Sequence, residues 1–113
     1  MFNKKIIPLK LSISKSEVDS KALLNQGVKV FVSGKSYIVF KQNNAYIAVR
    51  NNCPHQNKPL EGAKCIENSI ICPYHQYKFD TKSGKGHGMF IDIYQVISDG
   101  NQLTLLLPKT GLF

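Results

Sequence analysis

The sequence has 113 residues, of which 42% are hydrophobic, and it carries a formal net charge of +8. This length predicts one domain with a modest core, and the longest apolar runs are too short to span a bilayer. Three cysteines are too few for a disulfide framework.

The positive charge lies mainly in the first half of the chain, where residues 1–50 hold nine Lys or Arg against two acids. These cations form no run of four or more and are spread between apolar residues, which is typical of solvated strand edges and argues against nucleic-acid binding. The first ten residues are basic, but no apolar stretch of about 7–15 residues follows them. We therefore expect no signal peptide, no membrane partner and a cytoplasmic location.

The chain begins with partly alternating apolar residues over Lys5–Ile13, which predicts a first strand. Pro8 within it indicates an edge position or a bulge. Residues 14–25 allow either a short helix or an irregular loop, and Ser16 followed by Asp19 resembles a weak helix cap.

Short runs rich in β-branched and aromatic residues then predict an all-β sandwich or barrel. The expected strands are Val28–Val32, Ser36–Phe40, Ala45–Val49, Tyr77–Asp80, Phe90–Ile97 and Gln102–Leu107. Asp99 and Gly100 give a strong hairpin signal between the last two strands. We expect a glycine-rich loop over Lys85–Gly88, and we expect Pro108 to end the last strand.

Two short boxes contain two of the three cysteines and two of the three histidines. Cys53-Pro54-His55 is followed, after sixteen residues, by Cys72-Pro73-Tyr74-His75. The proline after each cysteine favours an extended backbone at that cysteine. Between the boxes, two apolar runs flank Glu67-Asn68, and a hairpin there would bring the boxes face to face. The pattern predicts a metal site.

Two thiolates and two imidazoles suit either a tetrahedral zinc ion or an iron–sulfur cluster. Zinc sites usually pair like ligands, as Cys-x₂₋₄-Cys and His-x₃₋₅-His. Here each box mixes one cysteine with one histidine, which departs from the zinc pattern.

The boxes and their flanks, over residues 51–62 and 71–80 and then Ser83-Gly84, resemble the Rieske family. The resemblance implies an antiparallel all-β sandwich or barrel spanning 1–113 as one domain, with a small cluster-binding lobe inserted at about 51–90. It also implies one [2Fe–2S] cluster per chain, with Cys53 and Cys72 on one iron and His55 and His75 on the other.

Departures from the family pattern around the boxes bear on the reduction potential. High-potential members carry a disulfide between the boxes, but Lys58 and Tyr74 occupy those positions here. They also place hydroxyls at the positions of Tyr77 and Phe79, and Phe79 has none. The resemblance therefore implies a potential at the low end of the Rieske range. Gln76 stands where Gly often follows the second histidine.

By this resemblance the chain is a Rieske-type ferredoxin of an aromatic-ring dioxygenase-like system. It would pass single electrons from a flavin reductase to a terminal oxygenase, without catalytic residues or enzyme activity of its own. Two alternatives stay open: a small subunit of a nitrite-reductase-like complex, and a structural zinc-binding interaction module. Cys65 is expected as a buried apolar side chain on a strand, and His87 as a solvated loop residue.

Overall fold

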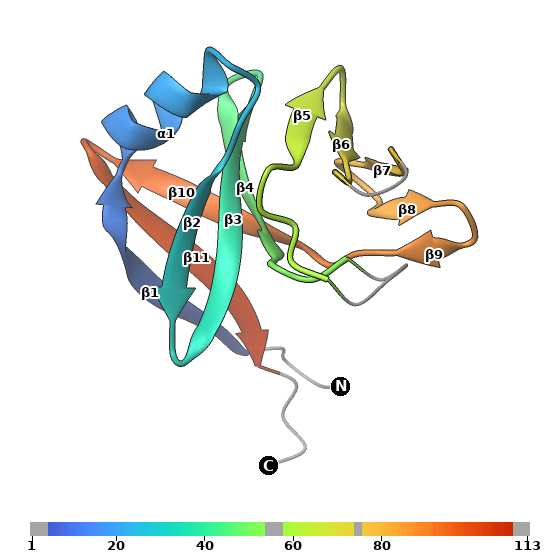
Figure 1. The fold of residues 1–113 in the computed structure, drawn as a ribbon. Helices are drawn as coiled ribbons and strands as arrows, with labels where there is room; N and C mark the ends of the chain where they lie inside the picture. The colour runs from blue at the N-terminus through green and yellow to red at the C-terminus, as the bar shows by residue number, and fades with distance from the viewer. Residues whose placement is uncertain (1–4, 54–57, 74–75, 110–113) are drawn as a thin grey trace.

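A six-stranded antiparallel sheet forms the larger part of the computed structural model, which describes residues 5–53, 58–73 and 76–109 (Figure 1). Its strands are β1 (Lys5–Ser14), β2 (Val28–Val32), β3 (Lys35–Gln42), β4 (Ala45–Arg50), β10 (Ile93–Asp99) and β11 (Gln102–Lys109). They lie in the order β1-β11-β10-β4-β3-β2. The sheet curls until its edge strands β1 and β2 approach each other, and we call it the barrel.

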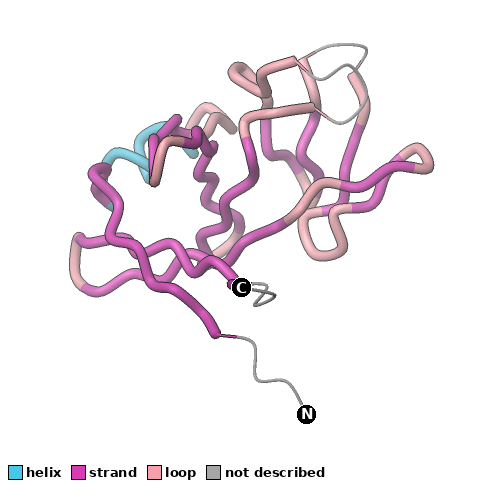
Figure 2. The backbone as a smooth tube through the Cα atoms, turned by 90° about the horizontal axis from the view of Figure 1, so that it is seen from below, coloured by secondary structure: helices cyan, strands magenta, loops and turns pink. Residues whose placement is uncertain are grey.

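The helix α1 (Lys15–Ala22) connects the two edge strands and packs beside them (Figure 2). Its N-cap is Ser14, whose side chain accepts a hydrogen bond from the backbone of Glu17, while Glu17 accepts one from the Ser14 backbone. The expected cap signal at Ser16 was therefore wrong by two residues. These two hydrogen bonds satisfy backbone N–H groups at the start of the helix that have no partner within it. Ser16 and Asp19 do not form such a pair of bonds.

Alternation along the strands fills the barrel interior with apolar side chains. In β1, for example, Leu11 and Ile13 are buried while Lys10 and Ser12 are exposed. The expected edge position of Pro8 is confirmed, because among the strands that the structure describes β1 pairs with β11 alone. The all-β fold is likewise confirmed.

A second unit lies between β4 and β10 in the chain and beside the barrel in space (Figure 1). It contains a three-stranded sheet of β5 (Lys64–Ile66), β6 (Ser69–Ile71) and β7 (Lys78–Asp80), and a hairpin of β8 (Lys85–Gly86) and β9 (Met89–Phe90). We call this unit the lobe. The predicted hairpin at Glu67-Asn68 is confirmed: both residues have positive φ, as a two-residue turn between β5 and β6 requires.

The third strand of the barrel has both faces buried, which explains how the lobe is held. Tyr37 and Val39 of β3 face the barrel interior, whereas Ile38 and Phe40 belong to the apolar cluster of the lobe. Ala48 and Val49 of β4 divide in the same way. A continuous apolar run is expected where a strand is covered on both sides.

Three details differ from the expected elements. The strand expected over Phe90–Ile97 begins at Ile93, because Phe90 belongs to β9. The loop expected over Lys85–Gly88 is the β8–β9 hairpin, with His87 and Gly88 at positive φ in its turn. Pro108 does not end β11, which runs to Lys109; the ladder with β10 stops at Leu106, so Pro108 has a partner on one side only.

Candidate metal centre

Two of the three cysteines meet in the interior of the lobe. Cys53 follows β4 and Cys72 follows β6, and their Sγ atoms are 3.1 Å apart. Both side chains are fully buried and pack in the same apolar cluster as Leu60 and Phe79. A disulfide would need about 2.05 Å between the sulfurs, so the two are thiols.

The cysteines open two matched loops. The backbone N–H of Cys53 donates to the carbonyl of Lys58 at 2.7 Å, and that of Cys72 donates to the carbonyl of Tyr77 at 2.8 Å. Each hydrogen bond closes a loop of four intervening residues, so both loops leave the lobe core at a cysteine. His55 and His75 fall inside these loops but outside the described residues, as does Tyr74.

The donor set fits a metal centre. Two thiolates on one tetrahedral metal at about 2.3 Å would lie about 3.8 Å apart, about 0.7 Å further than the two sulfurs are here, so both lie within reach of one metal after a small outward shift. Buried thiols with few polar neighbours have little to solvate a negative charge except a cation. In the described ranges no set of three or more Cys, His, Asp or Glu side chains converges, so the cysteine pair is the part of the predicted site that the structure describes.

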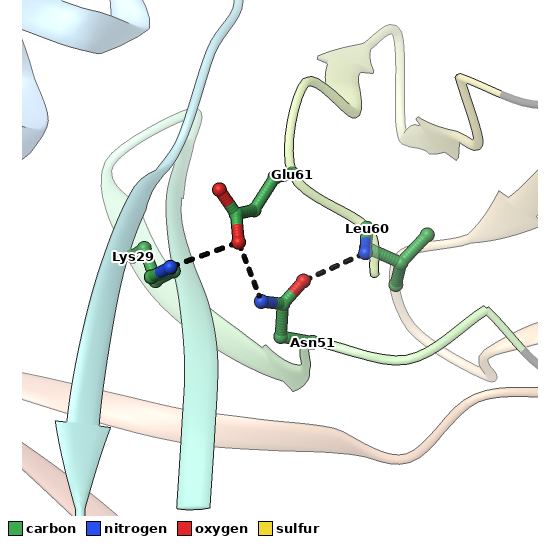
Figure 3. Close-up of polar contacts among 4 residues, drawn as sticks. All are labelled: Lys29, Asn51, Leu60 and Glu61. Atoms are coloured by element: carbon green, nitrogen blue, oxygen red, sulfur yellow. Dashed lines mark hydrogen bonds and ion pairs between the residues drawn. The ribbon is translucent and has the colours of Figure 1, made fainter. Parts of the chain in front are cut away.

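A polar network closes the base of the first loop, and sequence reasoning assigned it no role (Figure 3). The Asn51 side-chain oxygen accepts from the backbone N–H of Leu60 at 2.7 Å, across the loop that carries Cys53. The Asn51 amide also donates to Glu61 at 3.3 Å, and Lys29 of β2 donates to the same carboxylate oxygen at 2.9 Å. Lys29 and Asn51 hold the pKa of Glu61 below its usual value.

This network ties the lobe to the barrel as well as closing the loop, because Lys29 belongs to β2. The sequence signalled this network only through Asn51, two residues before the first cysteine. Asparagine side chains frequently form hydrogen bonds with nearby backbone groups. The partner of Asn51, Leu60, lies nine positions away, so the pairing itself could not be read from the sequence.

The second loop is shaped by Gln76 and Tyr77. Gln76 has φ of +57°, the left-handed region that glycine adopts most easily, which explains why glycine suits this position. The half-buried ring of Tyr77 stacks on His87, with centroids 4.3 Å apart and planes 18° from parallel. His87 is exposed, and its Nε2 accepts from the backbone N–H of Lys78 at 3.3 Å. The β8–β9 hairpin thus supports the strand that leaves the second loop.

Phe79 and Cys65 lie on the inner face of the three-stranded sheet. Phe79 is fully buried and packs in the same apolar cluster as both paired cysteines. Cys65 is half-buried against this cluster on β5, and burial raises the pKa of its thiol. Its backbone N–H donates to Asn25 at 2.9 Å. The structure thus places Cys65 at the edge of the apolar cluster of the lobe as a packing residue, less buried than expected.

Comparison with known proteins gives the family. The model of the Rieske [2Fe-2S] domain matches residues 13–89. Among curated proteins, a chloroplastic chlorophyllide a oxygenase of Chlamydomonas reinhardtii is 29% identical over 48 residues, covering 42% of this chain and 7% of that protein. The chain belongs to the Rieske [2Fe–2S] domain family, and its cofactor is a [2Fe–2S] cluster.

Solved structures of two kinds share the fold. NdmA of Pseudomonas putida CBB5 has a TM-score of 0.76 at 17% identity, covering 88% of this chain but 33% of its own, so this chain spans about a third of that protein. The ferredoxin of carbazole 1,9a-dioxygenase from Nocardioides aromaticivorans IC177 has a TM-score of 0.67 at 24% identity, covering 90% of this chain and 98% of its own. A Sphingomonas yanoikuyae B1 ferredoxin has a TM-score of 0.66 at 20% identity, covering 94% and 100%.

One further finding concerns membranes. Within the part of the chain that the structure describes, no helix combines the length and the apolar character that crossing a bilayer requires.

Proposed function

We propose that this chain is a one-electron carrier whose [2Fe–2S] cluster is held by Cys53 and Cys72 on one iron and by His55 and His75 on the other. The observation that carries the proposal is the pair of buried thiols at 3.1 Å, each at the start of a loop that also contains one histidine. A bound [2Fe–2S] cluster supplies a one-electron redox couple.

The ligand set favours reduction at a moderate potential. Two thiolates and two neutral imidazoles leave the oxidised site uncharged, and an added electron gives it a charge of about −1. Four thiolates would begin at about −2, which makes the added electron more costly. The protein keeps the two thiols fully buried, and Asn51 and Lys58 hold the first loop closed beside them.

We expect the reduction potential to lie at the low end of the Rieske range. Phe79 packs among the apolar side chains around both cysteines, and it has no hydroxyl that could donate a hydrogen bond to the site. Phe79→Tyr should raise the reduction potential by about 40 mV, the equivalent of one hydrogen bond of about 1 kcal/mol that favours the reduced site. Protein-film voltammetry measures the shift, with Phe31→Tyr on β2 as the control. An unchanged potential in cluster-loaded Phe79→Tyr would refute this explanation.

The partners proposed are a flavin-containing reductase as donor and a terminal oxygenase as acceptor, in the cytoplasm. Support comes from the ferredoxins that share the fold over nearly their whole length. A related structure is described as a complex of reduced oxygenase and oxidised ferredoxin in carbazole 1,9a-dioxygenase; its similar chain has a TM-score of 0.71 at 17% identity. The chain itself would activate no oxygen and would have no catalytic residues.

The test is an anaerobic redox titration of the purified protein. The proposal expects about two iron and two acid-labile sulfide per chain, with one electron taken up from dithionite. The reduced protein should then be reoxidised by a terminal oxygenase of the carbazole type but should not turn over an aromatic substrate alone. A cluster-loaded chain that accepts no electron, or one that oxidises substrate unaided, would contradict the proposal.

A further inference from the structure

Three exposed lysines surround the backbone of the candidate centre: Lys58, Lys64 and Lys78. The carbonyl of Lys58 accepts the hydrogen bond that closes the Cys53 loop. Lys78 follows Tyr77, whose carbonyl closes the Cys72 loop. Lys64 pairs with Ile71, the residue before Cys72. Each lysine is therefore adjacent to a cysteine loop, either in the sequence or through backbone pairing.

The register of the small sheet separates opposite charges along its outer face. Lys64, Ile71 and Lys78 form one row across β5, β6 and β7, at the end that carries the Cys72 loop. Ile66, Ser69 and Asp80 form the next row, two residues or about 7 Å further from that loop. Opposite residues on neighbouring strands project to the same face, so cations lie toward the centre and the carboxylate away from it.

Three acids of the lobe either have a polar partner or lie far from the Cys72 loop. Glu61 forms an ion pair with Lys29 at 2.9 Å. Asp80 accepts from the backbone N–H groups of Lys82 and Ser83, which lower the pKa of its carboxyl. Glu67 lies in the β5–β6 turn, at the far end of the sheet from Cys72. The stretches within 51–90 that the structure leaves undescribed contain no Lys, Arg, Asp or Glu. Asp92, between β9 and β10, lines the same pocket as the cation Arg50. The charged residues nearest to the two cysteine loops in the sequence and in the sheet register are therefore mainly lysines.

We propose that Lys58, Lys64 and Lys78 form a docking surface for an acidic face of a redox partner protein. This rests on the proposed electron-carrier function and adds the charge of the partner. Cations around the site of electron exit raise the encounter rate with an anionic partner and orient it toward that site. A protein partner fits better than nucleic acid, because three single lysines give little of the phosphate-tracking surface that nucleic acid needs.

The experiment measures how fast the dithionite-reduced protein is oxidised by two small probes of opposite charge. Ferricyanide stands in for an acidic partner and tris(phenanthroline)cobalt(III) for a basic one. At an ionic strength of about 0.1 M, where screening acts over about 10 Å, each of Lys58→Gln, Lys64→Gln and Lys78→Gln should slow ferricyanide about two- to fourfold and speed the cobalt complex. Matched controls, Lys82→Gln in the far turn and Lys10→Gln on β1, remove the same charge and should change either rate less than about 1.5-fold.

The paired probes separate steering from a change in reduction potential. A shifted potential moves both oxidation rates in the same direction, whereas steering moves them in opposite directions. Site and control variants with equal effects on ferricyanide, or site variants that move both probes together, would overturn the docking proposal.

A competition identifies the class of partner. Polyglutamate should protect the reduced wild-type protein from ferricyanide more than it protects the triple variant of the three lysines. Stronger protection by duplex DNA than by polyglutamate, at equal charge concentration, would assign the surface to nucleic acid and overturn the proposal. A chain that takes up no electron would refute the carrier function and the docking surface together; a redox-active chain without lysine dependence would refute only the docking surface.

Discussion

The barrel and the lobe differ in the length of their strands and in the side chains that fill their interiors. In the barrel, strands of five to ten residues surround side chains that are almost all aliphatic or aromatic. In the lobe, strands of two or three residues surround a smaller cluster that includes Cys53 and Cys72. Such short strands are marginal without further support, whereas the six-stranded barrel has a core of its own.

The difference teaches where the stability of each unit comes from. Apolar burial stabilises the barrel whether or not a metal is bound. The lobe depends on the contacts of its cysteines, on the Asn51 network and on the β3–β4 face against which it packs. Metal binding at such a site contributes directly to folding free energy. The variants below should therefore affect the two units unequally.

The largest effect is expected from Cys53→Ser, which removes one thiolate of the candidate centre. It should abolish the cluster and expose lobe amides over 64–90 to hydrogen exchange, while barrel amides stay protected. Iron and sulfide analysis together with exchange mass spectrometry measure both effects. The control is Cys65→Ser, which should retain the cluster. Equal cluster loss in both variants would contradict the assignment of the pair.

Truncation in the barrel should have the converse pattern. Leu105 of β11 is fully buried in the barrel core, so Leu105→Ala should cost about 2–5 kcal/mol of unfolding free energy. Ile97, which is 52% exposed on the neighbouring strand, is the control, and Ile97→Ala should cost less than about 0.5 kcal/mol. Urea denaturation followed by circular dichroism measures both. Equal costs would show that the barrel interior is not the source of its stability.

Asn51→Ala tests the junction between the two units. It removes the acceptor for the Leu60 N–H and one donor to Glu61, which should cost about 1–3 kcal/mol. Because this bond closes the Cys53 loop, the variant should also release iron to a chelator faster than wild type. Asn52→Ala is the matched control, since Asn52 is exposed and its backbone N–H bond to Arg50 is unaffected. Indistinguishable iron release from the two variants would remove the loop-closing role.

The smallest effect concerns a polar contact of the barrel. The Tyr46 hydroxyl donates to Asp19 of α1 at 2.5 Å. Burial and this bond raise the pKa of Tyr46 to about 12 from 10.0, and the bond lowers the pKa of Asp19. The folded state therefore holds the tyrosine proton more tightly, and the contribution is complete below pH 10 and lost as the pH rises toward 12.

Tyr46→Phe should cost about 1 kcal/mol at neutral pH and flatten the decline in stability above pH 10. Asp19 has the opposite effect at acid pH. Its contribution to the stability of the fold is present above its ordinary pKa of 3.8 and is lost as the pH falls through its lowered pKa in the folded state. Asp19→Asn should remove this loss of stability at acid pH while keeping part of the loss above pH 10. An unchanged alkaline decline in Tyr46→Phe would exclude this contact as its cause.

The sequence predicted the strands well because the alternation of apolar and polar residues is a local pattern. The structure brings Cys53 and Cys72 together, and their role as cluster ligands stays a prediction. Val28–Val32 was predicted with its observed bounds, and the positive φ of Glu67 and Asn68 gives the predicted turn. Less could be predicted where the conformation of a residue depends on contacts with residues elsewhere in the chain. Ser14 caps the helix through Glu17, and Asn51 closes a loop on Leu60. Pro108 is tolerated because the pairing of β11 with β10 extends only to Leu106. The stacking of His87 on Tyr77 likewise depends on where the β8–β9 hairpin folds.

Pulsed EPR of the reduced protein, with ¹⁵N in histidine alone, tests the central assignment most directly. We expect a paramagnetic [2Fe–2S] centre coupled to two histidine nitrogens, one from each loop. In cluster-loaded His55→Cys or His75→Cys, the coupling to one nitrogen should be lost. The His87→Cys control should keep both couplings. A reduced, cluster-loaded wild-type protein without histidine coupling would contradict the mixed ligand set and the account built on it.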